Sequence, residues 1–263
     1  MRFTVLMENT GPQDLFIEHG LSLYLETCGH RILFDAGQSG HFADNAARLG
    51  VDLNKVELAI LSHGHYDHGD GMPRFLCEHP GVPLYLQKTA FGGHYHGPER
   101  YIGLTPKLQE FPGLRFTDSK MVPASGLTLL TCEEQPAVCP IDSCGLTRME
   151  GNRLVPEDFR HEQVLLIEEN GRRIVVSGCT HKGVRNLMAW LQPDVFIGGF
   201  HLKEYDPETQ EGRAALEIVA KELLRYPTQY YTCHCTGSAQ FAFLKARLGE
   251  RVQALHTGDT IDL

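Results

Sequence analysis

Three histidines and one aspartate follow an apolar run in the segment LAILSHGHYDHGDG, residues 58–71. His63, His65, Asp67 and His68 fall within six positions of this segment. Neutral imidazole and ionised carboxylate are ligands of zinc, manganese and ferrous iron, whereas magnesium and calcium prefer sites made of oxygen alone. Because four ligands on one turn cannot all surround a single ion, the spacing predicts that they divide between two metal ions.

Short apolar segments broken by Gly, Pro or Asn predict the strands that must position this turn. They span residues 2–8, 21–27, 30–37, 57–63 and 83–87 in the first half, and 127–132, 162–169, 172–179, 194–200 and 229–235 in the second. Helical spacing is found at 39–50, 183–191, 208–225 and 238–248, the first with Ser39 as expected N-cap and Gly50 as stop. Two strand-rich halves with helices predict an α/β fold in which two sheets pack face to face under outer helices.

Residues 92–160 differ from both halves, because Gly, Pro and Tyr are frequent there and periodicity is weak. Long loops in a compact domain usually carry function. We therefore expect a single domain over residues 1–263, in which 92–160 form a loop-rich insertion that shapes the substrate pocket.

The composition of the chain limits the classes of molecule that the protein is expected to bind. The chain has 263 residues, 42% hydrophobic and 22% charged, with a formal net charge of -9 and no cluster of Lys and Arg. Nucleic acid is not expected as a partner, since binding it needs clustered cations. No apolar run is long enough to span a membrane or to act as a leader, and eight cysteines are too few for a secreted disulfide scaffold. We expect a cytoplasmic protein with reduced thiols and a small-molecule substrate; the sequence assigns no oligomeric state.

The H-x-H-x-D-H motif at 63–68 resembles the signature of the metallo-β-lactamase superfamily. Further segments occur in the order found in one of its subfamilies: EHGLS at 18–22, ILFDAGQSG at 32–40, GCTHKG at 178–183, IGGFHL at 197–202 and CHCTG at 233–237. That subfamily includes archaeal dihydropterin synthases of methanopterin biosynthesis and many uncharacterised bacterial hydrolase-like proteins. The resemblance implies an αββα sandwich with a two-metal site at one edge, between the sheets.

The resemblance also implies a role for each residue of the motif. His63 and His65 match the ligands of the first metal, Asp67 and His68 those of the second, and His234 the last histidine of the superfamily.

One position departs from the superfamily pattern. Where a bridging carboxylate is usual, this chain has Cys179, and His181 follows two residues later. Cys179, His181 or both are therefore expected as ligands. We expect two divalent ions, zinc above all, because a thiolate favours zinc, although a site of His and Asp alone accepts manganese or iron.

Other residues are expected around these ligands. Asp35 resembles the superfamily aspartate that holds a ligating imidazole by its other nitrogen, and His19 is expected near the site. His201 ends an apolar strand, where it either hydrogen-bonds substrate or a metal-held water or caps the strand. We expect Asp67 and His201 to take part in the reaction. A further superfamily histidine has no match in a diagnostic motif; the nearest are His161, His94 and His96.

Two metal ions that share a bridging hydroxide imply hydrolysis of a small phosphorylated or ester substrate. Lys182 and Arg185 either lie near a phosphate or form a solvated helix end. Two alternatives stay open: a dihydropterin-forming transferase, implied by the subfamily, and a non-catalytic metal-binding or sensing protein. No G-x-S-x-G elbow, phosphate-binding P-loop or dinucleotide fingerprint is present.

Overall fold

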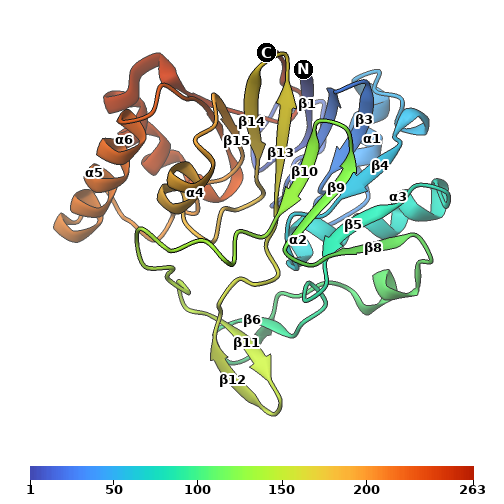
Figure 1. Ribbon diagram of the computed structural model, residues 1–263, viewed down its shortest axis with the longest axis horizontal. Coiled ribbons are helices and arrows are strands. Elements are labelled where there is room, and N and C mark those ends of the chain that lie inside the picture. Colours follow the sequence, from blue (N-terminus) through green and yellow to red (C-terminus); the bar gives the residue numbers. More distant parts are fainter.

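Two seven-stranded mixed sheets form the centre of the protein, in a computed structural model that describes residues 1–263 (Figure 1). The first sheet has the order β18-β1-β2-β3-β4-β5-β8. Its strands are β1 (Arg2–Met7), β2 (Ser22–Thr27), β3 (His30–Phe34), β4 (Leu58–Ile60), β5 (Leu84–Gln87), β8 (Leu114–Thr117) and β18 (Thr260–Asp262). From β3 to β8 the strands run parallel, so their carboxyl ends meet at one edge.

The second sheet is drawn mainly from the other half of the chain, in the order β17-β16-β15-β14-β13-β10-β9. Its strands are β9 (Lys120–Ala124), β10 (Leu127–Leu130), β13 (Val164–Glu169), β14 (Arg172–Val176), β15 (Val195–Ile197), β16 (Gln229–Thr232) and β17 (Val252–Ala254). Strands β14 to β17 are parallel. The C-terminal β18 returns to pair with β1, which ties the two halves together.

Helices cover the outer face of each sheet. The helices α1 (His41–Arg48) and α3 (Met72–Glu78) pack on the first sheet, and α4 (Val184–Leu191), α5 (Gln210–Leu224) and α6 (Ser238–Leu248) on the second (Figure 1). One buried cluster of 20 residues fills the space between the sheets, and clusters of 20 and 19 lie between each sheet and its helices. Three apolar layers between four structural layers confirm the expected αββα sandwich. None of the helices is both long enough and apolar enough to cross a membrane.

The predicted strands and helices are found with small shifts at their ends. Ser39 is not the N-cap of α1; Gly40 holds that position, and the Ser39 hydroxyl accepts a bond from the His41 amide instead. Gly40 has no side chain that could cap the helix. The helix α1 therefore begins one residue later than an N-cap at Ser39 would predict.

Residues 92–160 contain more regular structure than expected. A third, four-stranded sheet, β12-β11-β6-β7, is built from β6 (His94–His96), β7 (Arg100–Tyr101), β11 (Leu146–Glu150) and β12 (Arg153–Pro156). It projects away from the sandwich at the bottom of Figure 1. The expectation of loops was wrong for the β11–β12 hairpin: its strands are mostly half-buried or exposed, so the apolar alternation that marks a strand is weak there.

Candidate metal centre

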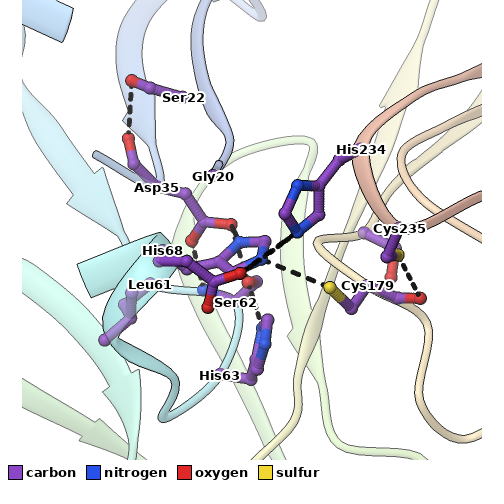
Figure 2. Close-up of polar contacts among 12 residues, drawn as sticks. Gly20, Ser22, Asp35, Leu61, Ser62, His63, His68, Cys179, His234 and Cys235 are labelled. Atoms are coloured by element: carbon purple, nitrogen blue, oxygen red, sulfur yellow. Dashed lines mark hydrogen bonds and ion pairs between the residues drawn. The ribbon is translucent and has the colours of Figure 1, made fainter. Parts of the chain in front are cut away.

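The expected ligands come from loops that follow strands at one edge of the two sheets. Asp35 follows β3, the 63–68 turn follows β4 and includes the short helix α2 (Tyr66–Gly69), and Cys179 and His181 follow β14. His234 lies two residues after β16. Because the parallel strands of both sheets end at this edge, these side chains converge between the sheets, as Figure 2 shows for Asp35, His63, His68, Cys179 and His234.

The buried carboxylate of Asp35 organises the histidine turn. One oxygen accepts from the Ser62 amide at 2.7 Å; the other accepts from the Ser62 hydroxyl and from Nδ1 of His68, each at 2.7 Å (Figure 2). Since the Ser62 hydroxyl gives its hydrogen to Asp35, its oxygen accepts from Nδ1 of His63 at 2.8 Å. One carboxylate therefore turns Nε2 of both His63 and His68 toward the interior of the site.

His68 and His234 form one group of ligands. Nδ1 of His234 donates to the Asn9 side-chain oxygen at 2.9 Å, so its Nε2 carries a lone pair, and this atom lies 3.2 Å from Nε2 of His68. Two nitrogens of a tetrahedral zinc site lie roughly 3.3–3.4 Å apart, given bonds of about 2.0–2.1 Å. The Cys179 sulfur is 3.3 Å from the same His68 nitrogen. The spacing and the lone pairs fit a divalent ion.

His63 and His181 form a second group. Their Nε2 atoms are 3.3 Å apart, and Nδ1 of His181 is buried without a partner. The ligand atoms of His63, Cys179 and His181 all lie within 4.8 Å of one another, as do those of His68, Cys179 and His234. The Cys179 sulfur thus belongs to both groups. Both residues that the sequence left as alternatives, Cys179 and His181, face the site.

Glu162, two residues before β13, fixes the loop that carries Cys179 and His181. Its carboxylate accepts from the amides of His181 at 2.6 Å and Lys182 at 2.9 Å. Gly178 lets this loop approach the histidine turn, since a Cβ there would lie 2.2 Å from the Ser62 hydroxyl oxygen. The two halves of the chain therefore meet directly at the site.

Asp67 lies on the solvent side of the His68–His234 group. One of its oxygens is 3.2 Å from Nε2 of His19 and 3.3 Å from Nε2 of His234. His19, Asp67 and His234 form a further group whose ligand atoms lie within 4.8 Å of one another. His19 is half exposed and so stands between the site and solvent.

A third set of imidazoles lies behind His65, on the side of the third sheet. Ligand atoms of His65, His94 and His161 lie within 4.8 Å of one another, and each Nε2 is buried without a hydrogen-bond partner, although that of His161 lies 3.7 Å from the Glu157 carboxylate. Nδ1 of His94 donates to Glu157 at 2.7 Å, and Nδ1 of His161 accepts from the Gly64 amide at 2.9 Å. A neutral His161 therefore carries its hydrogen on Nε2, which makes that atom a donor rather than a metal ligand.

A cavity of about 170 Å³ opens onto the ligands. Its wall contains the ligand candidates His65, Asp67, Cys179, His181 and His234, together with His19 and His201. The ring of His201 packs 4.4 Å from that of His181, and its backbone has a φ of 51°, which is uncommon for a residue other than glycine. His201 thus lies where it can contact a molecule in the cavity. The polar part of the wall also includes Tyr66, His96, Arg100, Lys203 and Glu204.

Burial sets the protonation of most ligands. It lowers the pKa of His65 and of His234 to about 3, and that of His63 and His181 well below the usual value. His68 is the exception: burial opposes its charge, but Asp35 and Asp67 outweigh burial and raise its pKa to about 9. Without metal, a proton on His68 fills the gap to His234; a metal ion there must displace it.

Comparison with known proteins identifies the family of the chain. Residues 17–222 match the sequence model of the Metallo-beta-lactamase superfamily. The chain belongs to this superfamily. The shared region contains the 63–68 motif, Cys179 and His181, while His234 lies beyond it.

Individual relatives are distant. The chain is 27% identical over 207 residues to uncharacterized protein MJ0448 of Methanocaldococcus jannaschii, covering 75% of this chain and 78% of that protein. It is 25% identical over 278 aligned positions to 7,8-dihydropterin-6-methyl-4-(beta-D-ribofuranosyl)-aminobenzene-5'-phosphate synthase of the same organism, covering 93% and 90%. A crystal structure of Tm1679, described as a metal-dependent hydrolase of the beta-lactamase superfamily, superposes with a TM-score of 0.82 at 24% identity, over 100% of this chain and 99% of that one.

Several residues that build the site had no sequence signal. Glu8 accepts from the His234 amide at 2.6 Å, Asn9 holds the His234 ring, and Glu162 holds the loop of His181. Of the two cysteines that flank His234, Cys233 packs in the central core. Cys235 lines the cavity and donates to the Cys179 carbonyl, because β16 ends at Thr232 and strand alternation does not continue.

We predict that Asp35→Asn weakens metal binding by about 10- to 100-fold, because the amide cannot accept from both Ser62 and His68. Titration with zinc against a competing chelator measures the affinity. Asp118→Asn is the matched control, since that carboxylate is 82% exposed and pairs with Lys88 at the surface. Equal affinity in Asp35→Asn and wild type would contradict the role assigned to Asp35.

We also predict that the metal-free protein loses stability below about pH 6.5, the ordinary histidine pKa. The unfolded chain binds protons there that His63, His65, His181 and His234 cannot bind when folded; each contributes up to about 1.4 kcal/mol per pH unit. His68 acts in the opposite sense: its stabilising contribution is complete below about pH 6.5 and is lost as pH rises through about 9.

Urea denaturation in the presence of a chelator at pH 7.5 and pH 5.5 measures this effect. The free energy of unfolding is expected to be lower at pH 5.5 by several kcal/mol. Equal stability at the two values would mean that these histidines already carry protons in the folded protein.

Proposed function

We propose that this protein is a binuclear metal-dependent hydrolase that acts on a small anionic ester, most simply a phosphate ester. The observation that carries the proposal is the Cys179 sulfur shared by two convergent ligand groups, at the floor of a cavity that a small molecule can enter. Two bound divalent ions would lower the pKa of a water molecule and polarise a phosphoryl or carbonyl oxygen.

Two sets of side chains would hold the two ions, and further side chains orient these ligands. His63 and His181 would hold the first ion, joined by His65, whose ring lies 4.6 Å from that of His63. Asp67, His68 and His234 would hold the second, and the Cys179 sulfur lies within reach of both groups. Asp35 orients His63 and His68, and Asn9 orients His234.

His201 stands beside the ligands and acts on the substrate side. Burial lowers the pKa of His201 to about 4, so it is neutral at pH 7. A neutral ring donates or accepts a hydrogen bond to a water or substrate oxygen without adding a charge to the site.

Charge in the cavity supports an anionic substrate. Arg100 lines the wall and donates to the Tyr66 hydroxyl at 3.1 Å, which leaves most of its guanidinium free. Lys203 lines the same wall, with Glu204 as its neighbour of opposite charge. A small molecule with one or two negative charges fits this cavity, whereas the net charge of -9 of the whole chain disfavours nucleic acid.

A second candidate rests on one comparison. The dihydropterin synthase relative is similar over 93% of this chain, and such a transferase would use the same two ions to activate a phosphorylated pterin. A non-catalytic metal-binding or sensing protein would need the ligands, but it would not need free cations in the cavity beside them. We therefore place this third alternative last.

Turnover assays distinguish these candidates. Metal-loaded protein is incubated with aryl phosphomonoesters, a phosphodiester and a neutral acetate ester, and separately with dihydropterin pyrophosphate plus an aminobenzoate ribofuranosyl phosphate. We expect hydrolysis of a phosphate ester, and we expect Lys203→Ala to raise KM for that substrate while Lys120→Ala, an exposed lysine on β9, leaves it unchanged. No turnover of any substrate by protein that retains two ions would exclude both enzymatic functions.

A further inference from the structure

A second cavity adjoins the one that opens onto the ligands. It has a volume of about 280 Å³ and lies between the start of α4, one face of α5, the segment 139–144 and the segment 200–205. His181 and His201 line both cavities, so the two are neighbours across these rings. We call the second cavity the Arg185 pocket.

The Arg185 pocket has an apolar wall. Val184, Phe200, Leu202 and Val219 are buried around it, and Ile218 lies half exposed at its rim. Ligand sites usually begin at about 300 Å³, so this pocket has room for roughly one ring or a short aliphatic chain. An apolar wall beside a polar metal centre suits a molecule that has an ester group at one end and a hydrocarbon group next to it.

Arg185 is the cation of this pocket and has no partner of its own. It forms no ion pair and no hydrogen bond, and its Nε is buried without a partner. Its position in the first turn of α4 adds the positive end of the helix dipole. The acid in the pocket wall, Asp142, already accepts from the Cys144 amide at 2.9 Å. Because no acceptor of the protein pairs with it, the guanidinium of Arg185 is available to bind an anion in the pocket.

Lys182, three residues before Arg185, is a cation with a structural role. Its ammonium group is buried and donates to the carbonyls of Thr131 at 2.8 Å and Glu162 at 2.9 Å. The sequence left open whether Lys182 and Arg185 lie near a phosphate or form a solvated helix end. The structure separates them, since Lys182 supports the fold and Arg185 faces a cavity with its Nε out of water.

We infer that the Arg185 pocket binds the non-reacting part of the substrate, an aromatic or aliphatic group that ends in a carboxylate or phosphate held by Arg185. The inference rests on the proposed function in one respect: the ester group of the same molecule would lie in the ligand cavity, on the other side of His181 and His201. The substrate is then anionic at both ends and apolar between them.

Matched probes test the pocket. Metal-loaded protein is given phenyl phosphate or 4-carboxyphenyl phosphate, which differ only in the distal carboxylate, and both binding by calorimetry and turnover are measured. Wild-type protein is expected to bind the carboxylated probe about tenfold or more tightly. Arg185→Ala is expected to remove this preference and to leave the affinity for phenyl phosphate unchanged.

Two further variants control the result. Arg213→Ala removes an exposed arginine of α5 outside the pocket and should retain the preference. Ile218→Trp narrows the pocket while keeping Arg185, and it should weaken binding of both probes, so the test stands even if Arg185→Ala folds poorly.

The outcomes separate the pocket from the proposed function. If both proteins, wild type and Arg185→Ala, turn over both probes and bind the two probes equally tightly, the inference about the Arg185 pocket is wrong and the proposed hydrolase function stands. A preference for the carboxylated probe that depends on Arg185, without turnover, would support the pocket and count against the hydrolase. If the wild type does not prefer 4-carboxyphenyl phosphate to phenyl phosphate, the inference about the Arg185 pocket is wrong whether or not the probes are hydrolysed.

Discussion

The buried carboxylate of Asp35 is the interaction on which the metal centre depends. It fixes Ser62 and His68 directly and His63 through Ser62, so that three side chains of one turn have a single allowed arrangement of hydrogens. Nε2 of both imidazoles then faces the interior, where a divalent ion would displace the proton that His68 holds without metal. Asp35 itself has a φ of 57°, a conformation that is uncommon outside glycine and that brings its carboxylate back over the turn.

The sandwich brings two such loops together from distant parts of the sequence. The first sheet supplies Asp35 and the histidine turn, and the second supplies Cys179, His181 and His234. Gly178 allows the two loops to approach closely at this edge, where a Cβ would meet the Ser62 hydroxyl. The third sheet adds His94 behind His65, and Glu157 follows its strand β12, while the segments beside α4 and α5 add the Arg185 pocket. The core therefore positions the ligands, and the irregular segments shape what can reach them.

The sequence predicted the layers well because the strands are apolar and are separated by clear turn residues. It also identified the 63–68 turn, since three imidazoles and a carboxylate at such close spacing are typical of a metal site. It could not decide between Cys179 and His181, because that choice depends on a shared position in space that spacing along one loop does not determine. Glu8, Asn9 and Glu162 were missed for a related reason: a carboxylate or amide that supports a residue far away in the chain has no local pattern. The β11–β12 hairpin was missed because partly exposed strands lack strong alternation.

The central claim is that the two ligand groups that meet at Cys179 would hold two divalent ions, and metal content tests it most directly. Protein purified without a metal-affinity column is analysed for zinc, manganese and iron, as wild type and as the His63→Ala and His68→Ala variants. We predict close to two ions per chain in the wild type and fewer in each variant, with all three proteins folded. A wild type that holds no metal, even after reconstitution with zinc, would contradict the claim.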